Sequence, residues 1–486
     1  MAYLHNSKSA AVRAKLSHPV IDADGHWLEP VPIFLDFLHA EGGVKMVDRW
    51  RAAKSAEDGW YELDAVARRH QRLRRPTWWA EPANTLDRAT AMVPGLMYER
   101  LDDFGVDYAI VYSTLGLVQA TLPDDEMRAA VCRALNTMNA ELFAPYADRM
   151  TPVAVIPSVT PDEAIAETRY AVQTLGLKTI MIANHVRRPV PAQLERAKDA
   201  AAAGYYVDFL ALDSPYDYDP FWQLCVDLKL AVTAHSSAMG WQNRSAVENF
   251  TFNHIGHFAE ASHGFTKALL FGGVLQRFPD LRFGLLEGGA GWACNLLTDT
   301  IGHWQKRHAQ AVQANARPSN LDLTRLGDLL AEYGGARYQN KMDDILASPS
   351  TLKPFYSAQF LTDREAPYPV DDFARANINS ADDLRRLFAE RFFFGCEADD
   401  PSAAWAFHHA HRLNPMFSSD VGHFDVIDMS EVLEEAYELV DHELISVDAF
   451  KEFTFTNAAK LHTAQNPQYF DGTVVEQAVR ETLALK

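Results

Sequence analysis

Eight short apolar runs recur along most of this 486-residue chain, and stretches with helical spacing separate them. The runs lie at 20–24, 107–114, 151–158, 179–184, 230–237, 282–289, 391–398 and 415–422. Near-continuous apolar runs are typical of parallel strands that are covered on both faces of a sheet. Eight such strands alternating with helices predict a (β/α)₈ barrel of the TIM type. A doubly wound sheet has the same alternation and remains the second candidate fold.

Two spacers between the expected strands are longer than a simple barrel connection requires. We expect insertions at about 30–100, after the first strand, and at about 305–390, after the sixth. The first contains the aromatic segment PTWWAEP, and the second contains PYPVDD, which indicates irregular structure. Long insertions at a barrel rim usually form lids or subunit contacts. The sequence therefore predicts a single domain over 1–486, with its barrel at about 20–462.

Charge and composition argue against several classes of protein. The formal net charge of −20 disfavours nucleic acid as the main partner. We expect no membrane span, because no apolar run reaches about 18 residues. The first 20 residues lack the apolar segment of a secretory signal. The four cysteines show no CxxC pairing, so we expect reduced thiols in a cytoplasmic protein.

Polar side chains gather where the apolar runs end. In a (β/α)₈ barrel, the catalytic groups lie at the C-terminal ends of the strands. The residues at these ends are Asp24, His26, His235, Glu287, Glu397 and Asp420. A carboxylate at a mostly buried strand end needs a partner, and either a metal ion or an arginine would supply one.

The first of these strand ends lies within VIDADGHWLEP, at 20–30. Because strand side chains alternate, Asp22, Asp24 and His26 are expected to face the same side. Two acids and an imidazole in that arrangement suit a metal ion. A loop with a capping aspartate explains the motif equally well at this point.

The other strand ends also have a simpler explanation beside the functional one. A histidine such as His235 after an apolar run is often a core residue, and Asp420 in SSDVGH could cap a helix. Glu397 precedes Asp399 and Asp400, and three acids in four residues could form a solvated turn. Asp420 nevertheless reads as a ligand, because the last strand of a closed barrel lies beside the first.

Three further histidines lie near these positions in the sequence. His254 and His257, in NHIGHFAEASH, are spaced i, i+3 on an expected helix face. We expect them to be outer-shell or substrate-facing groups. His423 follows Asp420 by three residues.

Taken in order, these motifs resemble the amidohydrolase superfamily, in the branch of aminocarboxymuconate-semialdehyde decarboxylase and its relatives. The segments that carry the resemblance are IDADGH, TAHSS, FPDLRFGLLEGGAGW and SSDVGH. The resemblance implies a distorted (β/α)₈ barrel with a divalent metal held by Asp24, His26, His235 and Asp420.

The chain departs from that branch where it replaces histidines by acids. Asp24 stands in place of the first motif histidine, and Glu287 in place of a catalytic histidine. Lys178 precedes the fourth strand, so no lysine stands at that strand's tip. Carboxylate-rich sites with a few imidazoles suit iron or manganese better than zinc. Together with Glu397 and Asp420, these acids could offset the charge of two divalent ions, with cobalt or zinc as further candidates.

In these replacements of histidine by acids, the chain resembles an offshoot of the superfamily that contains a dimetal isobutylamine N-hydroxylase and a diterpenoid hydroxylase. The first functional hypothesis is therefore a dimetal monooxygenase that hydroxylates a small amine or apolar substrate. Asp24, His26 and Asp420 would hold one ion, and His235 and Glu287 the other, with Glu397 as a bridge. Glu287, His257 and His423 would take catalytic roles, and His254 would orient ligands. The resemblance also implies a separate flavin reductase as the electron donor.

Two other hypotheses come from different classes. A metal-dependent hydrolase or non-oxidative decarboxylase of a small organic acid would use the metal as a Lewis acid, with Glu287 or a water as base. Arg187 and Arg188 would then be candidates to bind a substrate carboxylate. A non-catalytic subunit beside an active homologue is the third hypothesis. For all three we expect an oligomer, either of this chain alone or with a homologous second subunit.

Overall fold

The eight expected strands form one parallel sheet in the structure, a computed structural model that describes residues 7–57, 59–73, 81–196, 204–235, 246–316, 320–348 and 371–484. The strands are β1 (Ile21–Trp27), β2 (Tyr108–Ser113), β3 (Met150–Ile156), β4 (Thr179–Ala183), β7 (Val232–His235), β8 (Phe283–Leu285), β9 (Phe392–Cys396) and β10 (Pro415–Phe417). They neighbour one another in the order β1-β2-β3-β4-β7-β8-β9-β10. This consecutive order confirms the (β/α)₈ barrel, because a doubly wound sheet reverses its order partway.

Backbone hydrogen bonds join the first strand to the segment that follows the last one. His26 N donates to Val421 O at 2.7 Å, and Asp420 N donates to Asp24 O at 3.1 Å. These bonds bring the two ends of the strand order together around the barrel. They also place the acid of SSDVGH directly beside the first motif.

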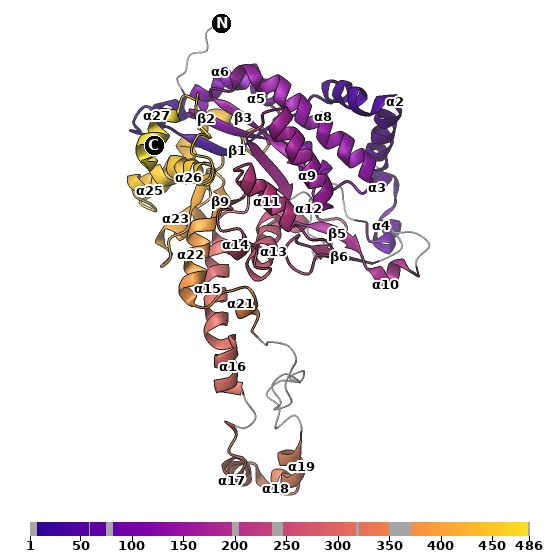
Figure 1. Cartoon of the computed structure of the whole chain (residues 1–486), viewed down its shortest axis with the longest axis vertical. Helices are drawn as coiled ribbons and strands as arrows, with labels where there is room; N and C mark the ends of the chain where they lie inside the picture. Colours follow the sequence, from indigo (N-terminus) through magenta and orange to yellow (C-terminus); the bar gives the residue numbers. More distant parts are fainter. Residues whose placement is uncertain are drawn as a thin grey trace. The chain divides into compact units, whose positions relative to one another are not determined.

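The helices of the barrel unit begin where the sequence signals them. Thr160 and Glu163 form a capping box at the start of α9 (Pro161–Arg169), with Pro161 in the first turn. Helix α11 (Asp219–Asp227) opens on an Asp-Pro pair. Helix α8 (Asp125–Phe143) packs against β3 on one side and against α2 (Val31–Glu57) on the other (Figure 1).

The barrel unit contains further α-helices besides these. They are α1 (Lys8–Arg13), α3 (Gly59–Glu62), α4 (Ala65–Gln71), α5 (Thr85–Met92), α6 (Pro94–Phe104), α7 (Gly116–Gln119), α10 (Pro191–Leu194), α12 (Phe250–His254), α13 (His257–Phe271), α14 (Val274–Arg277), α23 (Ser402–His408), α24 (Val432–Asp441), α25 (Val447–Lys451), α26 (Asn457–Thr463) and α27 (Glu476–Leu483). None of the helices in the described ranges is long and apolar enough to cross a membrane.

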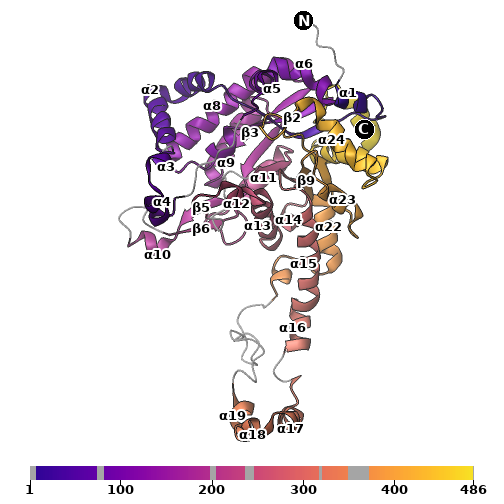
Figure 2. The ribbon, with the colours of Figure 1, turned by 180° about the vertical axis from the view of Figure 1, so that it is seen from behind.

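A two-stranded antiparallel ribbon follows β4 and was not expected from the sequence. It pairs β5 (Val186–Pro189) with β6 (Tyr205–Asp208), and both views show it near α10 and apart from the barrel strands (Figure 2). Arg188 on this ribbon is buried, where it pairs with Asp208 and donates to Tyr218 Oη at 3.0 Å. The ribbon therefore engages one of the two arginines considered above for substrate binding.

The chain divides into two compact units, Met1–Asn295 with Leu387–Lys486, and Leu296–Arg386. The smaller unit lies where the second insertion is expected. Its helices are the later part of α15 (Gly291–Arg307), α16 (Ala309–Ala316), α17 (Leu323–Tyr333), α18 (Gly335–Gln339), α19 (Met342–Ala347), α21 (Asp372–Arg375) and the first part of α22 (Ala381–Arg391). Most of PTWWAEP and the first four residues of PYPVDD lie outside the described residues.

All four cysteines are free thiols, as expected. Cys132, Cys225 and Cys396 are buried, and Cys294 is half-buried.

Candidate metal centre

Six side chains meet at the C-terminal ends of the barrel strands and form two groups of potential ligand atoms. One group contains His26, Glu287, Asp420 and His423, and the other contains Asp24, His26 and His235. Within each group the ligand atoms lie within 4.8 Å of one another. His26 belongs to both, so the two groups form one continuous cluster.

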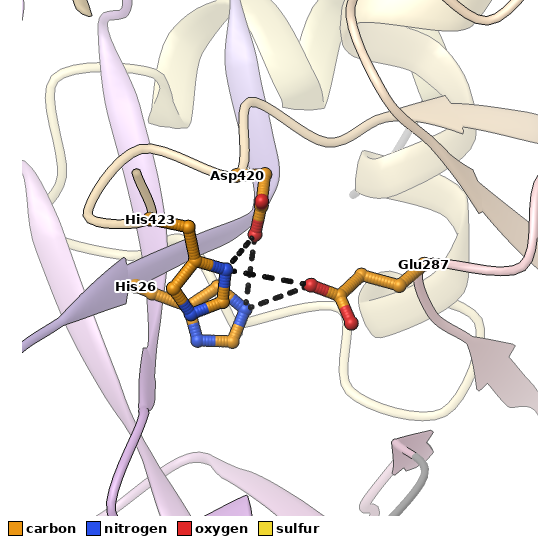
Figure 3. A group of neighbouring side chains, drawn as sticks. All are labelled: His26, Glu287, Asp420 and His423. Carbon is orange, nitrogen blue, oxygen red and sulfur yellow. Dashed lines mark ion pairs between the residues drawn. The ribbon is translucent and has the colours of Figure 1, made fainter. Parts of the chain in front are cut away.

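Distances within the cluster centre on His26. Its Nε2 atom lies 3.5 Å from Asp24 Oδ1, 3.6 Å from Asp420 Oδ1 and 3.7 Å from Glu287 Oε1. The rings of His26 and His423 stack with their centroids 4.2 Å apart. Figure 3 shows both rings facing Glu287 and Asp420. The nitrogen Nδ1 of His423 is 2.6 Å from Asp420 Oδ1. On the other side, His235 Nε2 is 3.1 Å from Glu287 Oε2.

The backbone at two of these carboxylates adopts an uncommon conformation. Glu287 has φ of 53° and Asp420 has φ of 51°, which is the left-handed region that non-glycine residues seldom occupy. Such strain persists where the surrounding structure fixes it, and it is common at functional sites. Both residues lie just beyond the ends of their strands, β8 and β10, and both carboxylates belong to the cluster.

Asp22, the other aspartate of the VIDADGHWLEP motif, does not join the cluster. This is contrary to the expectation from strand alternation. The pairing of β1 with β2 shifts register between Asp22 and Gly25, so simple alternation fails there. Asp22 instead accepts hydrogen bonds from Ser419 N at 2.9 Å and Ser419 Oγ at 2.5 Å. It also accepts one from Asp24 N at 3.2 Å. Asp22 therefore fixes the backbone of both ligand-bearing segments.

We expect Asp22→Asn to weaken metal binding about 10- to 100-fold, the range found for groups that orient ligands. The amide keeps an oxygen in the place of Oδ1, which accepts from Ser419 N and Asp24 N, but its NH2 group replaces Oδ2 and cannot accept the hydrogen bond from Ser419 Oγ. Metal affinity measured by competition with a chelator checks this, and circular dichroism confirms that the variant folds. Unchanged affinity would show that Asp22 has no positioning role.

The buried polar atoms of the cluster fit a divalent transition metal. Among the described residues, no hydrogen-bond partner is found for either oxygen of Asp24 or for either ring nitrogen of His26 and His235. Unpaired buried polar atoms are costly unless a ligand or ion satisfies them. Three carboxylates with three imidazoles form a donor set that suits manganese or iron, and that also accepts cobalt or zinc.

Burial sets the protonation of this cluster in the absence of metal. Burial and the neighbouring Glu287 raise the pKa values of Asp24 and Asp420 well above their usual range. Burial lowers the pKa of His423 to about 4, and lowers that of His26 well below its ordinary value. The imidazoles of His26 and His423 are therefore neutral near pH 7 and ready to coordinate. A divalent ion would favour ionisation of the carboxylates.

Glu397 lies beside the cluster rather than in it. It lines the same cavity as Glu287 and Asp420 but is absent from both ligand groups. Its side chain keeps solvent-accessible surface because it faces the cavity, yet the protein around it still desolvates the carboxylate. Burial, followed by the charge of Glu287, raises the pKa of Glu397 to about 8. Its role as a bridge between two ions stays a prediction.

His254 and His257 do not share a helix face, which corrects the sequence-based expectation. Helix α12 ends at His254, and α13 starts at His257 after Gly256, whose φ is 71°. A hydrogen bond joins the two residues across this break, with His254 O 2.7 Å from His257 Nδ1. Burial lowers the pKa of His257 to about 3. His254 lines the cavity, whereas His257 is buried behind it.

Sequence reasoning missed several residues around the cluster. Glu29, in the same VIDADGHWLEP segment, is buried, bonds to Ser113 Oγ and accepts from Leu115 N at 2.9 Å. Between those two residues, Thr114 Oγ1 lies 3.4 Å from His423 Nε2. Tyr112 on β2 is also buried, with its ring 6.0 Å from that of His26. Tyr112 lies near the end of the 107–114 run, and Glu29 follows the apolar pair Trp27 and Leu28, which is the signal that could have found them.

Glu29 makes the metal-free protein less stable as the pH rises. Burial raises its pKa to about 7 from an ordinary 4.5, so near pH 6.5 the folded state holds a proton that the unfolded chain has released. The contribution of Glu29 to stability therefore falls by about 1 kcal/mol between pH 6.5 and 8, and Asp24 and Asp420, whose pKa values are also raised, act in the same direction. Glu397 acts in the same direction, with a smaller share because its carboxylate reaches solvent. The buried histidines His257 and His423 act in the opposite direction over the first part of this interval, because an unfolded histidine, with an ordinary pKa of 6.5, is still half protonated at pH 6.5. The contribution of Glu29 is therefore read from the difference between the wild type and a variant without its carboxyl group.

Urea unfolding of the metal-free protein at the two pH values measures this slope. The change in the free energy of unfolding between the two pH values is expected to be about 1 kcal/mol more favourable in Glu29→Gln than in the wild type, since the amide does not titrate. An equal change in the two proteins would contradict the assignment.

A cavity of about 450 Å³ opens beside the cluster. It is lined by His254, Gly256, Phe258, Ala259, Glu287, Gly288, Gly289, Gly291, Trp292, Glu397, Asp400, Ser402, Asp420 and Asp425. Neither Arg187 nor Arg188 is among them. The run of glycines after Glu287 leaves room in this wall, because a side chain at Gly288 would approach Trp292 Nε1 to 2.9 Å.

A barrel with polar strand ends and a buried cluster of carboxylates and imidazoles defines a class of metal-dependent enzyme. The family model described as Amidohydrolase matches residues 21–321. The chain belongs to the amidohydrolase family, which confirms the superfamily expected from its motifs. The narrower resemblance to the hydroxylase offshoot stays a prediction.

Solved structures share this fold at low sequence identity. A dihydroxybenzoic acid decarboxylase from Polaromonas sp. JS666, with bound manganese and the inhibitor 2-nitroresorcinol, is 13% identical, with a TM-score of 0.50 over 93% of this chain and 99% of that one. An amidohydrolase from Mycobacterium avium subsp. paratuberculosis K-10 is 15% identical, with a TM-score of 0.50 over 92% and 99%. Among curated proteins no match is found.

Proposed function

We propose that this chain is a metal-dependent enzyme that acts on a small organic substrate by Lewis-acid chemistry, as a hydrolase or a non-oxidative decarboxylase. The observation that carries the proposal is the cluster of buried, unpaired ligand atoms joined at His26 and opening onto a cavity. Membership of the amidohydrolase family supports it. Manganese is the first candidate metal, since the donor set suits it and the decarboxylase of the same fold holds it.

In this proposal Asp24, His26, His235 and Asp420 hold the ion. The ion, when bound, supplies Lewis acidity that polarises a carbonyl or carboxylate of the substrate. Glu287 belongs to the cluster and also lines the cavity, so its carboxylate is placed to accept a proton from a water or a substrate. His235, with its nitrogen 3.1 Å from Glu287 Oε2, orients that carboxylate. His423 is paired with Asp420 and orients it in the same way.

The experiment is anaerobic turnover by protein that has been stripped of metal and then reloaded with manganese, iron, cobalt or zinc. Anilides and esters test hydrolysis, and release of carbon dioxide from aromatic acids tests decarboxylation. We expect turnover without oxygen that depends on the metal, and that falls at least about 100-fold in Glu287→Gln, as loss of a general base predicts. A fully loaded protein that is inert without oxygen would argue against Lewis-acid chemistry.

A dimetal monooxygenase is the second candidate, and the number of potential ligands favours it. The resemblance implies four ligands for a single ion, whereas six potential ligands cluster here. Glu397 lies nearby, on the wall of the same cavity. Metal analysis that finds two ions per chain, with oxygen uptake in the presence of a reduced flavin, would favour this function. The flavin reductase, the homologous second subunit and the oligomeric state remain predictions that belong to this candidate.

A further inference from the structure

The two ring nitrogens of His423 face different surroundings. Nδ1 lies 2.6 Å from Asp420 Oδ1 and 3.7 Å from Glu287 Oε1, so it faces the cluster (Figure 3). Nε2 lies 3.4 Å from Oγ1 of Thr114, the residue that follows β2. His423 is 2% exposed, and its ring stacks on that of His26. The ring therefore turns one nitrogen to the candidate metal centre and the other to the end of a neighbouring segment.

A metal ion at the cluster would take Nδ1 as the ligand atom of His423. A neutral histidine binds a metal through the nitrogen that carries no proton, so the proton then lies on the other nitrogen and needs an acceptor. Coordination through Nδ1 therefore leaves an N–H group at Nε2. The hydroxyl oxygen of Thr114 is the acceptor that the structure places beside it.

Hydrogen bonds on both sides of Thr114 fix the turn that carries it. Glu29 accepts one from Ser113 Oγ and another, at 2.9 Å, from Leu115 N. The backbone nitrogen of Thr114 donates to Trp27 O at 3.3 Å. Glu29 is only 8% exposed, and it belongs to neither ligand group of the cluster. Its buried carboxylate therefore holds the turn rather than the ion.

The opposite tautomer of His423 is the competing arrangement. With the proton on Nδ1, the ring would donate to Asp420, and the Thr114 hydroxyl would donate to Nε2. That tautomer has no lone pair at Nδ1 to offer to a metal ion. The position of the proton in the metal-loaded protein therefore distinguishes a ligand held by Thr114 from a histidine that only contacts Asp420.

We propose that Thr114 is a positioning residue of the metal centre, whose hydroxyl accepts the Nε2–H of His423 and so presents Nδ1 of that ring to the ion. Glu29 acts one step further away, by holding the turn that carries Thr114. The inference rests on the proposed function, because it needs a divalent ion at the cluster. It extends the role of His423 from contact with Asp420 to coordination.

Thr114→Val removes the acceptor and keeps the size and branching of the side chain. We expect its manganese affinity to fall about 10-fold, at the lower end of the range for groups that orient ligands, because 3.4 Å is long for a hydrogen bond. Thr114→Ser keeps a hydroxyl and should restore most of the affinity. Competition with a fluorescent chelator measures all three proteins. Wild-type affinity in Thr114→Val would overturn the proposal.

Thr168 provides the matched control. It is fully buried on α9, a helix that carries none of the candidate ligands, and its Oγ1 has no hydrogen-bond partner among the described residues. Thr168→Val therefore loses a buried hydroxyl without losing a hydrogen bond, and it should bind manganese as the wild type does. A loss as large as that in Thr114→Val would mean that affinity reports general damage, which would also overturn the inference.

Nitrogen-15 NMR of the histidine rings gives a readout that does not depend on a variant of Thr114. The chemical shift distinguishes a protonated ring nitrogen from a metal-bound one, and zinc-loaded protein is diamagnetic. The signals of His423 are assigned by their absence from His423→Gln. We expect the wild type to carry the proton on Nε2 and zinc on Nδ1. A proton on Nδ1 in the zinc-loaded wild type would overturn the proposal.

Metal binding separates this inference from the proposed function. A wild-type protein that binds none of manganese, iron, cobalt and zinc would refute both. Metal-dependent turnover by the wild type, with unchanged manganese affinity in Thr114→Val, would refute the positioning role of Thr114 and leave the proposed function standing.

Discussion

His26→Ala is expected to lose its bound metal and, with it, all measurable activity. His26 Nε2 lies within 3.7 Å of carboxylate oxygens from Asp24, Glu287 and Asp420 and belongs to both ligand groups. Loss of an orienting group costs a metal site about 10- to 100-fold in affinity, so loss of a direct ligand should cost more than that. Elemental analysis after dialysis against a trace of chelator measures the change.

A second buried histidine provides the matched control. His18 is 4% exposed, and its Nε2 lies 3.1 Å from Thr454 Oγ1, away from the cluster. His18→Gln should keep full metal content, even if it lowers stability. Wild-type metal content in His26→Ala would remove this residue from the centre and undermine the proposed site.

The second large effect is stabilisation of the folded protein by metal. Without an ion, Asp24, Asp420 and Glu287 are crowded in the interior, where like charges and desolvation oppose folding. An ion that binds only the folded state stabilises it by about 2.7 kcal/mol at a free concentration 100 times its Kd. We therefore expect the melting temperature of chelated protein to rise by several degrees when manganese is added, whereas magnesium should have less effect.

The double variant Asp24→Asn, Asp420→Asn tests the cause of this stabilisation. It should abolish the shift with manganese, because two carboxylate ligands are gone. Its metal-free form should be at least as stable as that of the wild type, because the buried charges have been removed. Scanning fluorimetry with and without manganese measures both results. A shift of wild-type size in the double variant would mean that manganese acts elsewhere on the chain.

Local pattern was sufficient to predict the barrel. Each of the eight apolar runs became a strand of the sheet, α9 starts after its cap Thr160, and α11 starts at the pair Asp219-Pro220. These features depend on residues close together in the chain, which a sequence displays directly. The ribbon β5–β6 was missed because its strands alternate with solvent-exposed residues and carry little apolar signal.

For the candidate site, the sequence named most of the residues that meet, but it misplaced Asp22, His254 and His257. Asp24, His26, His235, Glu287 and Asp420 do come together, and His423 joins them as part of the cluster. Asp22 was placed wrongly, because a register shift in β1 breaks the alternation on which its position was inferred. His254 and His257 were placed on one helix, although Gly256 ends that helix between them.

The sequence by itself determined the fold class, the family and the kinds of ligand available, since those follow from local periodicity and from the residues at strand ends. The tertiary structure alone decided which polar groups meet and which satisfy each other elsewhere, as Arg188 does with Asp208 and Asp22 with Ser419. It also decided which acids line the cavity, because Glu397 and Asp425 come from separate segments of the chain. The physical reason is that a closed barrel joins residues nearly 400 positions apart, Asp24 and Asp420 among them, through backbone bonds that no local pattern encodes.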